Sequence, residues 1–205
     1  MATITDVCRL AGVSKATVSR VLNNTGQVKE STRAQVYKAI QELNYRPNGL
    51  AQALATQRSN TIGLILSDFN GNFFGDLLKQ AAQSVEEAGK HLIVTDGHDN
   101  PEREIAAFNM LVDRCCDAIV LYSRFLPEET LMQLIDESPV PLIVMNRQLL
   151  KAPERCVVFA QQEAAHAAVT HLLELGHRNI ACITARMRTP TARARLQGYR
   201  DALAD

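Results

Sequence analysis

Apolar residues along the chain follow two different periods, which separate an N-terminal head from a larger body. Over residues 1–46 they recur three and four positions apart, which is typical of amphipathic helices. From residue 61 onward, short continuous apolar runs alternate with helical patterns. Between these regions lie two polar breaks, at residues 45–49 and 56–60. We therefore expect a head over residues 1–57 and a body over residues 58–205.

The apolar runs of the body predict buried strands, because they do not alternate with polar residues. They lie at residues 62–66, 91–95, 118–121, 142–145, 157–159 and 180–184. Helical patterns follow them at about 74–88, 102–114, 128–137 and 163–175, with a final helix over about 191–205. Gly89 and Gly176 occupy helix ends, and Pro101 and Pro127 occupy helix starts. The pattern predicts an α/β fold in which helices cover both faces of a parallel sheet.

Residues 3–23, TITDVCRLAGVSKATVSRVLN, predict two helices joined by a tight turn. Thr3 and Asp6 form a capping-box pattern, Gly12 suits a left-handed turn, and Ser14 suits the cap of the second helix. A third helix is expected from about residue 31 to 43. The residues expected to face the core are Ile4, Val7, Leu10, Ala11, Val13, Val18, Val21, Leu22, Val36, Ile40 and Leu43. This is helix-turn-helix geometry, which leaves the second helix available for a DNA major groove.

Charge is distributed unevenly, although the 22 basic and 22 acidic residues balance overall. Residues 1–60 hold eight basic and three acidic side chains, and the remainder holds 14 and 19. A basic head on an acidic body is typical of a nucleic-acid-binding module joined to a soluble partner domain. The N-terminus lacks a signal-peptide pattern and no apolar run has membrane-spanning length. We expect a bacterial cytoplasmic protein that associates with the nucleoid and not with a membrane.

Candidate catalytic and metal-binding residues form no recognised pattern. The five cysteines are odd in number and lack metal-site spacing, and the five histidines are scattered. The chain contains no GxSxG, P-loop or HExxH arrangement. We therefore expect no metal, no cofactor and no enzymatic activity. The residues concerned are Cys8, Cys115, Cys116, Cys156, Cys182, His91, His98, His166, His171 and His177.

The segments AGVSKATVSRVLN (11–23), ELNYRPN (42–48) and GLAQALA (49–55) resemble the lactose/galactose repressor (LacI/GalR) family of bacterial transcription regulators. The wider pattern is most similar to regulators of β-glucoside or galactoside operons. The resemblance implies a hinge helix at about 47–55 and a body of the periplasmic-binding-protein type. It also implies a repressor of a sugar-utilisation operon, which binds a pseudo-palindromic double-stranded operator as a homodimer and responds to a small sugar.

Residues of the head take DNA-binding roles from this resemblance. Base edges are expected to meet Lys15, Ala16 and Arg20; the paired donors of Arg20 suit guanine, and the Ala16 methyl suits thymine. The candidate phosphate contacts are Thr3, Ser14, Thr17, Ser19 and Asn23, each of which is equally suited to helix capping or to solvent. Leu54 is expected to wedge into the minor groove, with a buried linker residue as the alternative. Gly49 lowers the helix propensity of the hinge by about 1 kcal/mol.

The candidate effector residues follow from the rule that ligands of open α/β sheets bind at the carboxyl ends of the strands. They are Asp68, Phe69 and Asn70, the nearby Phe73 and Phe74, and Asn146 and Arg147. Arg195 joins them because it matches the effector-binding arginine of the family. Aromatic faces with hydrogen-bonding side chains suit a sugar, although core packing also explains the phenylalanines. The family usually has an aspartate where this chain has Ala160, Gln161 and Gln162.

Several alternatives stay open at this point. The same sequence features also fit a regulator that responds to a nucleobase corepressor, or one that activates transcription. A stand-alone sugar-binding protein and an enzyme are more remote readings. Members of the family also continue through a second subdomain, so we expect a C-terminally truncated chain, either a fragment or the product of an interrupted gene, with an incomplete effector site.

Overall fold

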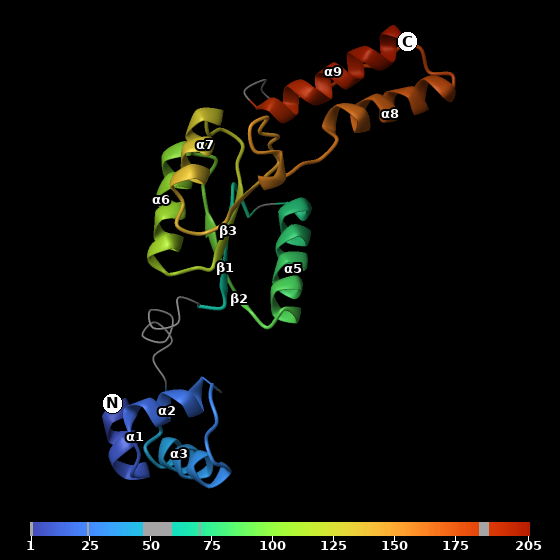
Figure 1. Ribbon diagram of the computed structural model, residues 1–205. Helices are drawn as coiled ribbons and strands as arrows, with labels where there is room; N and C mark the ends of the chain where they lie inside the picture. Colours follow the sequence, from blue (N-terminus) through green and yellow to red (C-terminus); the bar gives the residue numbers. More distant parts are fainter. Residues whose placement is uncertain (1, 24, 47–58, 70, 185–188) are drawn as a thin grey trace. The chain divides into compact units, whose positions relative to one another are not determined.

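The computed structural model describes residues 2–23, 25–46, 59–69, 71–184 and 189–205 (Figure 1). The chain divides into two compact units, Met1–Thr56 and Gln57–Asp205, which we call the head and the body. The expected hinge helix at 47–55, with Leu54, lies outside the described residues, as does Asn70.

The head is built from three helices, α1 (Ile4–Ala11), α2 (Lys15–Leu22) and α3 (Glu30–Glu42). Its core contains Val7, Val18, Val21, Val36 and Ala39, all buried, with the remaining predicted core residues packed around them except Leu10. Burying these side chains is what holds such short helices together, because helices of eight residues are marginal alone.

The prediction for Leu10 is wrong, since this side chain is 50% exposed. Leu10 stands at the margin of the contact between α1 and α3, where it lines a surface groove with Lys38 and Glu42. The central place between the helices is taken by Val7 and Ala39. Helical spacing identifies the apolar face of α1 but not how far the neighbouring helix extends over it.

The body contains the predicted parallel sheet. Its described strands are β1 (Thr61–Leu66), β2 (His91–Asp96), β3 (Ala118–Tyr122), β4 (Leu142–Met145) and β5 (Cys156–Val157). They lie in the order β2-β1-β3-β4-β5, and each neighbouring pair is parallel. The carboxyl ends of β1, β3 and β4 therefore lie along one edge of the sheet, which is where side chains from distant parts of the sequence meet.

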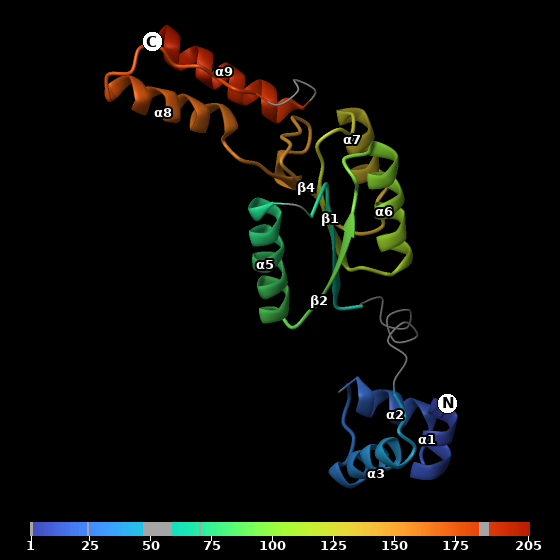
Figure 2. The same ribbon diagram turned by 180° about the vertical axis from the view of Figure 1, so that it is seen from behind.

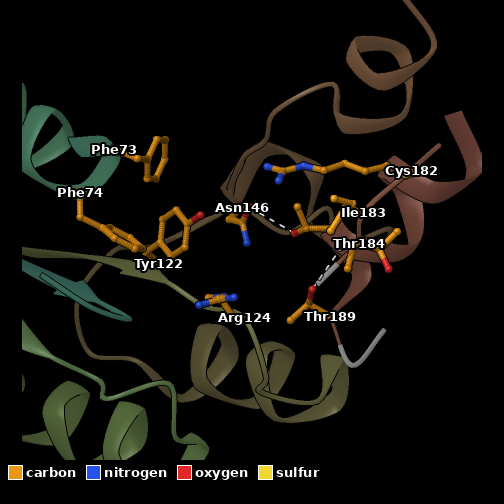
Figure 3. Close-up of a pocket in the computed structure, with 12 residues that line it drawn as sticks. Phe73, Phe74, Tyr122, Arg124, Asn146, Cys182, Ile183, Thr184 and Thr189 are labelled. Atoms are coloured by element: carbon orange, nitrogen blue, oxygen red, sulfur yellow. Dashed lines mark hydrogen bonds between the residues drawn. The ribbon is translucent and has the colours of Figure 1, made fainter. Parts of the chain in front are cut away.

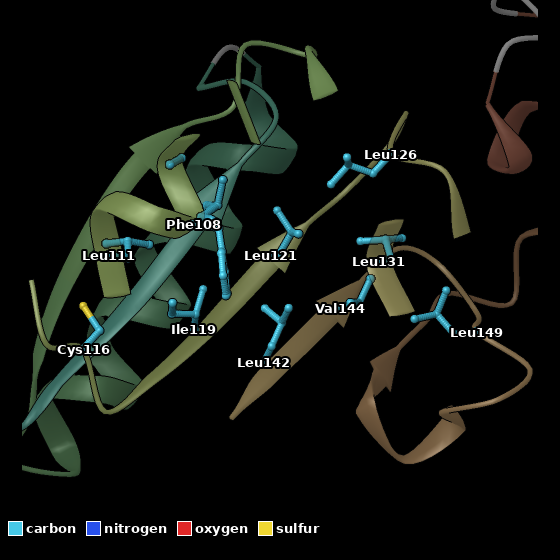
Figure 4. Packing of buried hydrophobic residues seen from close by; sticks show 12 residues of the cluster. Phe108, Leu111, Cys116, Ile119, Leu121, Leu126, Leu131, Leu142, Val144 and Leu149 are labelled. Carbon is cyan, nitrogen blue, oxygen red and sulfur yellow. The ribbon is translucent and has the colours of Figure 1, made fainter. Parts of the chain in front are cut away.

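Helices cover both faces of this sheet, as the two views in Figures 1 and 2 show. On one side lie α6 (Pro101–Asp113) and α7 (Glu128–Glu137), and on the other lies α5 (Asn72–Glu87). The main core fills the space between the sheet and the α6/α7 layer (Figure 4). Its fully buried members include Leu111, Ile119, Leu121, Leu131 and Leu142. A smaller cluster lies under α5 and contains Leu64, Leu66 and Tyr122.

The C-terminal part departs from the predicted strand–helix alternation. Helices α8 (Gln161–Glu174) and α9 (Pro190–Ala204) form as expected and pack against each other. The predicted strand at 180–184 does not form, and the predicted strand at 157–159 is reduced to the end of β5. A strand exists only where a neighbour completes its hydrogen-bond ladder, and no described strand pairs with residues 180–184.

Among the described residues, no helix combines the length and apolar character needed to cross a membrane. Across the same residues, no group of three His, Cys, Asp or Glu side chains is placed to hold a metal ion.

Candidate functional site

The turn before α2 sets the direction of that helix. Gly12 adopts a left-handed φ of 65°, and the next residue, Val13, donates its N–H to the carbonyl of Cys8 at 3.1 Å. Ser14 then caps α2 by accepting a hydrogen bond from the Thr17 N–H at 3.2 Å. These local bonds confirm the predicted helix-turn-helix connection and set the point at which α2 begins.

One face of α2 is exposed while the opposite face is anchored. Lys15, Ala16 and Arg20 are exposed, whereas Val18 and Val21 are completely buried in the head core. The exposed face thus carries two cationic side chains around a small methyl group. Such a face fits a DNA groove, because Arg and Lys reach base edges or phosphates and Ala admits close approach.

The predicted phosphate contacts lie at the N-terminal caps of α1 and α2, within α2 and at its C-terminal end. Thr3 forms the capping box of α1 with Asp6, and the hydrogen bonds from Thr3 lower the pKa of the Asp6 carboxyl. The Ser14 and Thr17 hydroxyls lie 3.0 Å apart, and Asn23 Nδ2 donates to Ser19 Oγ at 3.3 Å. Capping roles are therefore present in the structure, and phosphate contact by the same hydroxyls stays a prediction.

The body contains a cavity of about 300 Å³ beside the carboxyl edge of the sheet (Figure 3). Its wall combines residues from α5, the ends of β3 and β4, residues 182–184 and the start of α9. The lining residues are Phe73, Phe74, Tyr122, Arg124, Asn146, Cys182, Ile183, Thr184, Thr189, Thr191, Ala192 and Arg195. We call this cavity the pocket.

Aromatic rings form one wall of the pocket. Phe74 meets Phe73 and Tyr122 edge to face, with both ring-centroid distances at 5.2 Å, and Phe73 lies 6.0 Å from Tyr122. Tyr122 is only 7% exposed, and this burial raises the pKa of its hydroxyl. The packed rings give the pocket an apolar wall of ring faces and edges, which suits the C–H face of a sugar ring.

Polar groups face this wall from the end of β4 and from α9. Asn146 adopts a left-handed φ of 70°, and its N–H donates to the Val157 carbonyl at 2.8 Å. Its side-chain Oδ1 accepts a hydrogen bond from the Thr191 hydroxyl at 3.4 Å. Arg195 is held through its Nε, which donates to Gln161 Oε1 at 2.6 Å. This leaves the amide of Asn146 and the terminal nitrogens of Arg195 as hydrogen-bonding groups for a ligand.

The structure brings together four of the predicted effector residues, Phe73, Phe74, Asn146 and Arg195, at the pocket. Asp68, Phe69 and Arg147 are not among the described lining residues. Arg147 instead donates to the Leu126 carbonyl at 2.6 Å, and its burial lowers the pKa of the guanidinium. An effector role for these three residues, and for Asn70, stays a prediction.

Sequence reasoning missed Tyr122, Arg124, Thr189 and Thr191 at the pocket. Tyr122 and Arg124 follow the third predicted strand, so the rule used for the first and fourth strands would have found them. Arg124 Nη1 donates to both carboxylate oxygens of Asp99, at 3.0 and 2.8 Å. The threonines had no comparable signal, because their place at the pocket depends on how α9 packs.

A buried carboxyl group lies next to these residues. Glu104 on α6 is 0% exposed, and neither its oxygens nor the Ser123 hydroxyl has a hydrogen-bond partner of good geometry among the described residues. Burial raises the pKa of Glu104 to about 7, although the nearby Ser123 hydroxyl and Arg124 N–H lower it in part. The carboxyl therefore exchanges its proton near neutral pH.

Comparison with protein families divides the chain as the two units do. Residues 3–48 match the family described as "Bacterial regulatory proteins, lacI family". Residues 59–205 match "Periplasmic binding proteins and sugar binding domain of LacI family". The second match alone covers most of the chain.

Curated relatives include two regulators of Escherichia coli strain K12. The HTH-type transcriptional regulator AscG is 41% identical over 206 residues, which cover 100% of this chain and 61% of AscG. The HTH-type transcriptional regulator GalR is 38% identical over 205 residues, which cover 100% of this chain and 60% of GalR. The chain thus spans about three fifths of the length of these relatives.

Solved structures show the same similarity. A crystal structure of the Lac repressor dimer bound to operator and the anti-inducer ONPF matches with a TM-score of 0.85 at 27% identity, covering 99% of this chain and 62% of the other. The Escherichia coli transcriptional repressor ascG matches with a TM-score of 0.63 at 37% identity, covering 70% of this chain and 53% of the other.

Proposed function

Because the chain belongs to the LacI family of bacterial regulatory proteins, we propose that it is a sequence-specific DNA-binding transcription regulator. The observation that carries the proposal is the face of α2, where Lys15, Ala16 and Arg20 are exposed over a completely buried Val18 and Val21. A helix fixed in this way presents side chains to a major groove with little loss of conformational entropy on binding.

Each exposed residue of α2 has a distinct part in DNA recognition. Arg20 donates two hydrogen bonds to N7 and O6 of a guanine, and Ala16 contacts a thymine methyl group. Lys15 meets a base edge at the start of the helix. The hydroxyls of Thr3, Ser14, Thr17 and Ser19, with the amide of Asn23, position the head on phosphates. Leu54, beyond the described residues, wedges into a minor-groove step.

The regulator acts as a homodimer on a pseudo-palindromic operator in the bacterial cytoplasm. A single three-helix head offers too small a surface for tight and specific binding, and two heads add their contacts. Positions 1–60 hold eight basic and only three acidic residues, and this excess of positive charge supplies the electrostatic attraction to DNA. The crystal structure of the Lac repressor dimer, which this chain matches over 99% of its length, supports this arrangement.

The pocket of the body supports a repressor of a sugar-utilisation operon whose DNA binding responds to a small sugar. Phe73, Phe74 and Tyr122 provide an apolar aromatic wall, and Asn146 and Arg195 provide hydrogen-bonding groups opposite. This combination of ring faces and directed polar groups is the chemistry that a sugar requires. The relatives AscG and GalR are transcription regulators, which supports a regulator and not an enzyme.

The DNA-binding part is tested by selection from random duplex DNA with the full chain. The expected result is enrichment of a sequence with two related half-sites about one helical turn apart, seen also as two protected regions in footprinting. The control is a chain in which Lys38 is replaced by alanine, because Lys38 is an exposed cation of α3 and not of α2. Failure to enrich any sequence would overturn the proposal.

The effector part is tested by thermal shift and by DNA affinity. D-galactose, D-glucose, cellobiose, hypoxanthine and guanine are added to the full chain and to the Arg195→Gln and Arg200→Gln variants. A sugar that stabilises the wild type and Arg200→Gln but not Arg195→Gln, and that lowers operator affinity, supports a sugar-released repressor. Stabilisation by a purine that raises operator affinity would instead establish a nucleobase corepressor, and transcription raised by the bound regulator would establish an activator.

A further inference from the structure

The body begins at a carboxylate that holds the chain by three hydrogen bonds. Asp117 Oδ1 accepts from the Ser59 N–H at 2.7 Å and from the Ser59 hydroxyl at 3.1 Å. Its Oδ2 accepts from the Asn60 N–H at 3.0 Å. Ser59 is the first described residue after the segment 47–58 that joins the head to the body. We call this group of residues the clamp.

The clamp joins the amino ends of three neighbouring strands. The Asn60 carbonyl accepts the His91 N–H at 2.7 Å at the start of β2, and the Thr61 carbonyl accepts the Asp117 N–H at 2.8 Å beside β3. Lys90 Nζ lies 3.7 Å from Asp117 Oδ2. The residues that precede β1 are therefore tied by side-chain and backbone bonds from both adjacent strands.

Electrostatics favour the charged form of this carboxylate. Partial burial of Asp117 acts to raise its pKa, but the N–H and hydroxyl of Ser59, Lys90 and the Asn60 N–H together hold that pKa below its usual value. Hydrogen bonds to an ionised acceptor are stronger than neutral ones. Asn60 has a left-handed φ of 53°, a conformation that asparagine tolerates and that the carboxylate bond to its N–H stabilises.

We propose that Asp117 is a positioning residue for DNA binding, which fixes the point on the body, at Ser59 and Asn60, from which the chain continues towards the DNA-binding head. The inference rests on the proposed function. In a dimer on two half-sites, the separation of the heads depends on where each connecting segment leaves its body. An attachment point held by one carboxylate restricts that separation, while an untied one adds chain length between head and sheet.

The experiment measures how operator affinity depends on half-site spacing. The DNA probes are the operator enriched by the full chain, the same operator with one or two base pairs inserted between the half-sites, and a single half-site. Wild-type chain is expected to lose at least about tenfold in affinity when the spacing changes. Asp117→Ala is expected to bind the best spacing up to about tenfold more weakly, because a longer untied connection lowers the effective concentration of the second head at its half-site. The variant is also expected to discriminate between spacings by less than about threefold.

Two further variants separate positioning from folding. Asp117→Asn keeps the side-chain shape but turns one acceptor into a donor that faces an N–H, so its spacing discrimination should fall between wild type and Asp117→Ala. Asp113→Ala removes an equivalent charge from the exposed end of α6 and should behave as wild type. Single half-site affinity should be equal in all four chains, because the head is untouched.

Hydrogen exchange provides a readout that does not involve DNA. The amides of Ser59 and Asn60 should both exchange faster in Asp117→Ala than in Asp113→Ala, because the acceptors of both are lost, and one of the two should exchange faster in Asp117→Asn, where one acceptor becomes a donor. If the wild type enriches no operator, the proposed function fails. If it enriches one and Asp117→Ala keeps the wild-type spacing preference, the positioning role is overturned while DNA binding stands. Unchanged exchange at Ser59 and Asn60 would overturn the clamp itself.

Discussion

The exposed face of α2 and the pocket of the body hold their side chains by different means. The α2 face is built from an eight-residue helix and its cap, and the bonds that orient it join residues three apart in the sequence. The pocket draws its lining from residues 73 to 195, and its polar wall depends on contacts such as Asn146 with Thr191 and Gln161 with Arg195. A surface of the first kind depends on a short local sequence and on the head core beneath it, whereas a pocket of the second kind depends on every element of the body that supports it.

The largest effect is expected from a substitution that disturbs the pocket from a distance. A Cβ at Gly198 of α9 would overlap the Gln162 carbonyl oxygen and lie 3.0 Å from the His166 backbone nitrogen. Backbone atoms cannot move aside, so Gly198→Ala should lower the free energy of unfolding of the body by about 3 kcal/mol. Urea denaturation followed by circular dichroism measures it. The matched control is Gly75→Ala on α5, where a Cβ meets nothing within 4 Å and a small gain is expected. Equal effects in the two variants would contradict the close packing of α8 and α9.

A second substitution tests whether the buried carboxyl of Glu104, beside the pocket, keeps its proton up to neutral pH. The folded state keeps the Glu104 proton up to a pKa of about 7, whereas the unfolded chain releases it near the ordinary value of 4.5. Between these values the folded state binds more protons, so its stability falls as pH rises. The fall from pH 5 to pH 8 should be roughly 2 kcal/mol and should disappear in Glu104→Gln.

Urea denaturation at a series of pH values measures this slope, with Glu102→Gln as the control. Glu102 lies in the first turn of the same helix but is exposed. A Glu104→Gln chain with the wild-type pH dependence would show that Glu104 is ionised at neutral pH in the folded state. The α2 face contains no comparable group, so this test bears on the body alone.

The third prediction concerns the local surface. Arg20→Ala removes the longest donor of the α2 face without touching the buried Val18 and Val21. It should weaken binding to the selected operator by about 2 kcal/mol and binding to random DNA very little. Fluorescence anisotropy with both DNAs measures the difference. Equal losses on the two DNAs would show that Arg20 contacts a phosphate.

The smallest effect is expected at Ser14, where two substitutions separate helix capping by the hydroxyl from contact with a phosphate. Ser14→Ala removes the cap of α2 and should destabilise the head by about 1 kcal/mol. Ser14→Asp keeps an acceptor for the Thr17 N–H and should retain the stability, since a negative charge also suits a helix N-terminus. The same charge should weaken DNA binding if Ser14 lies at a phosphate. Full operator affinity in Ser14→Asp would leave Ser14 as a cap alone.

Much of the fold could be predicted because its determinants are local. Buried strands appear as apolar runs, and the caps at Thr3 and Ser14 follow from residues three apart. The errors arise where a distant segment decides the outcome. Leu10 is exposed at the margin of the contact between α1 and α3, and residues 180–184 form no strand because no described strand pairs with them. Neither outcome can be predicted from the sequence of the residues concerned alone.

The residues of the pocket fall into the same two groups, those that local sequence predicts and those that depend on tertiary contacts. Phe73, Phe74 and Asn146 could be placed from their position after predicted strands, and Arg195 from the family resemblance. The pairing of Arg124 with Asp99, and the presence of Thr189 and Thr191 at the pocket, follow from how β2, β3 and α9 come together. Predicting such contacts requires the tertiary arrangement and not only the period of each element.

The aromatic wall has a spectroscopic consequence. The chain contains four tyrosines and no tryptophan, so light at the long-wavelength edge of indole absorption, which tyrosine does not absorb, excites nothing in it. Phe73 packs against Phe74 and Tyr122 while its ring is still partly open to solvent. A tryptophan in place of Phe73 would thus be the single indole of the molecule, and its emission colour would report directly whether water or a bound molecule occupies the pocket.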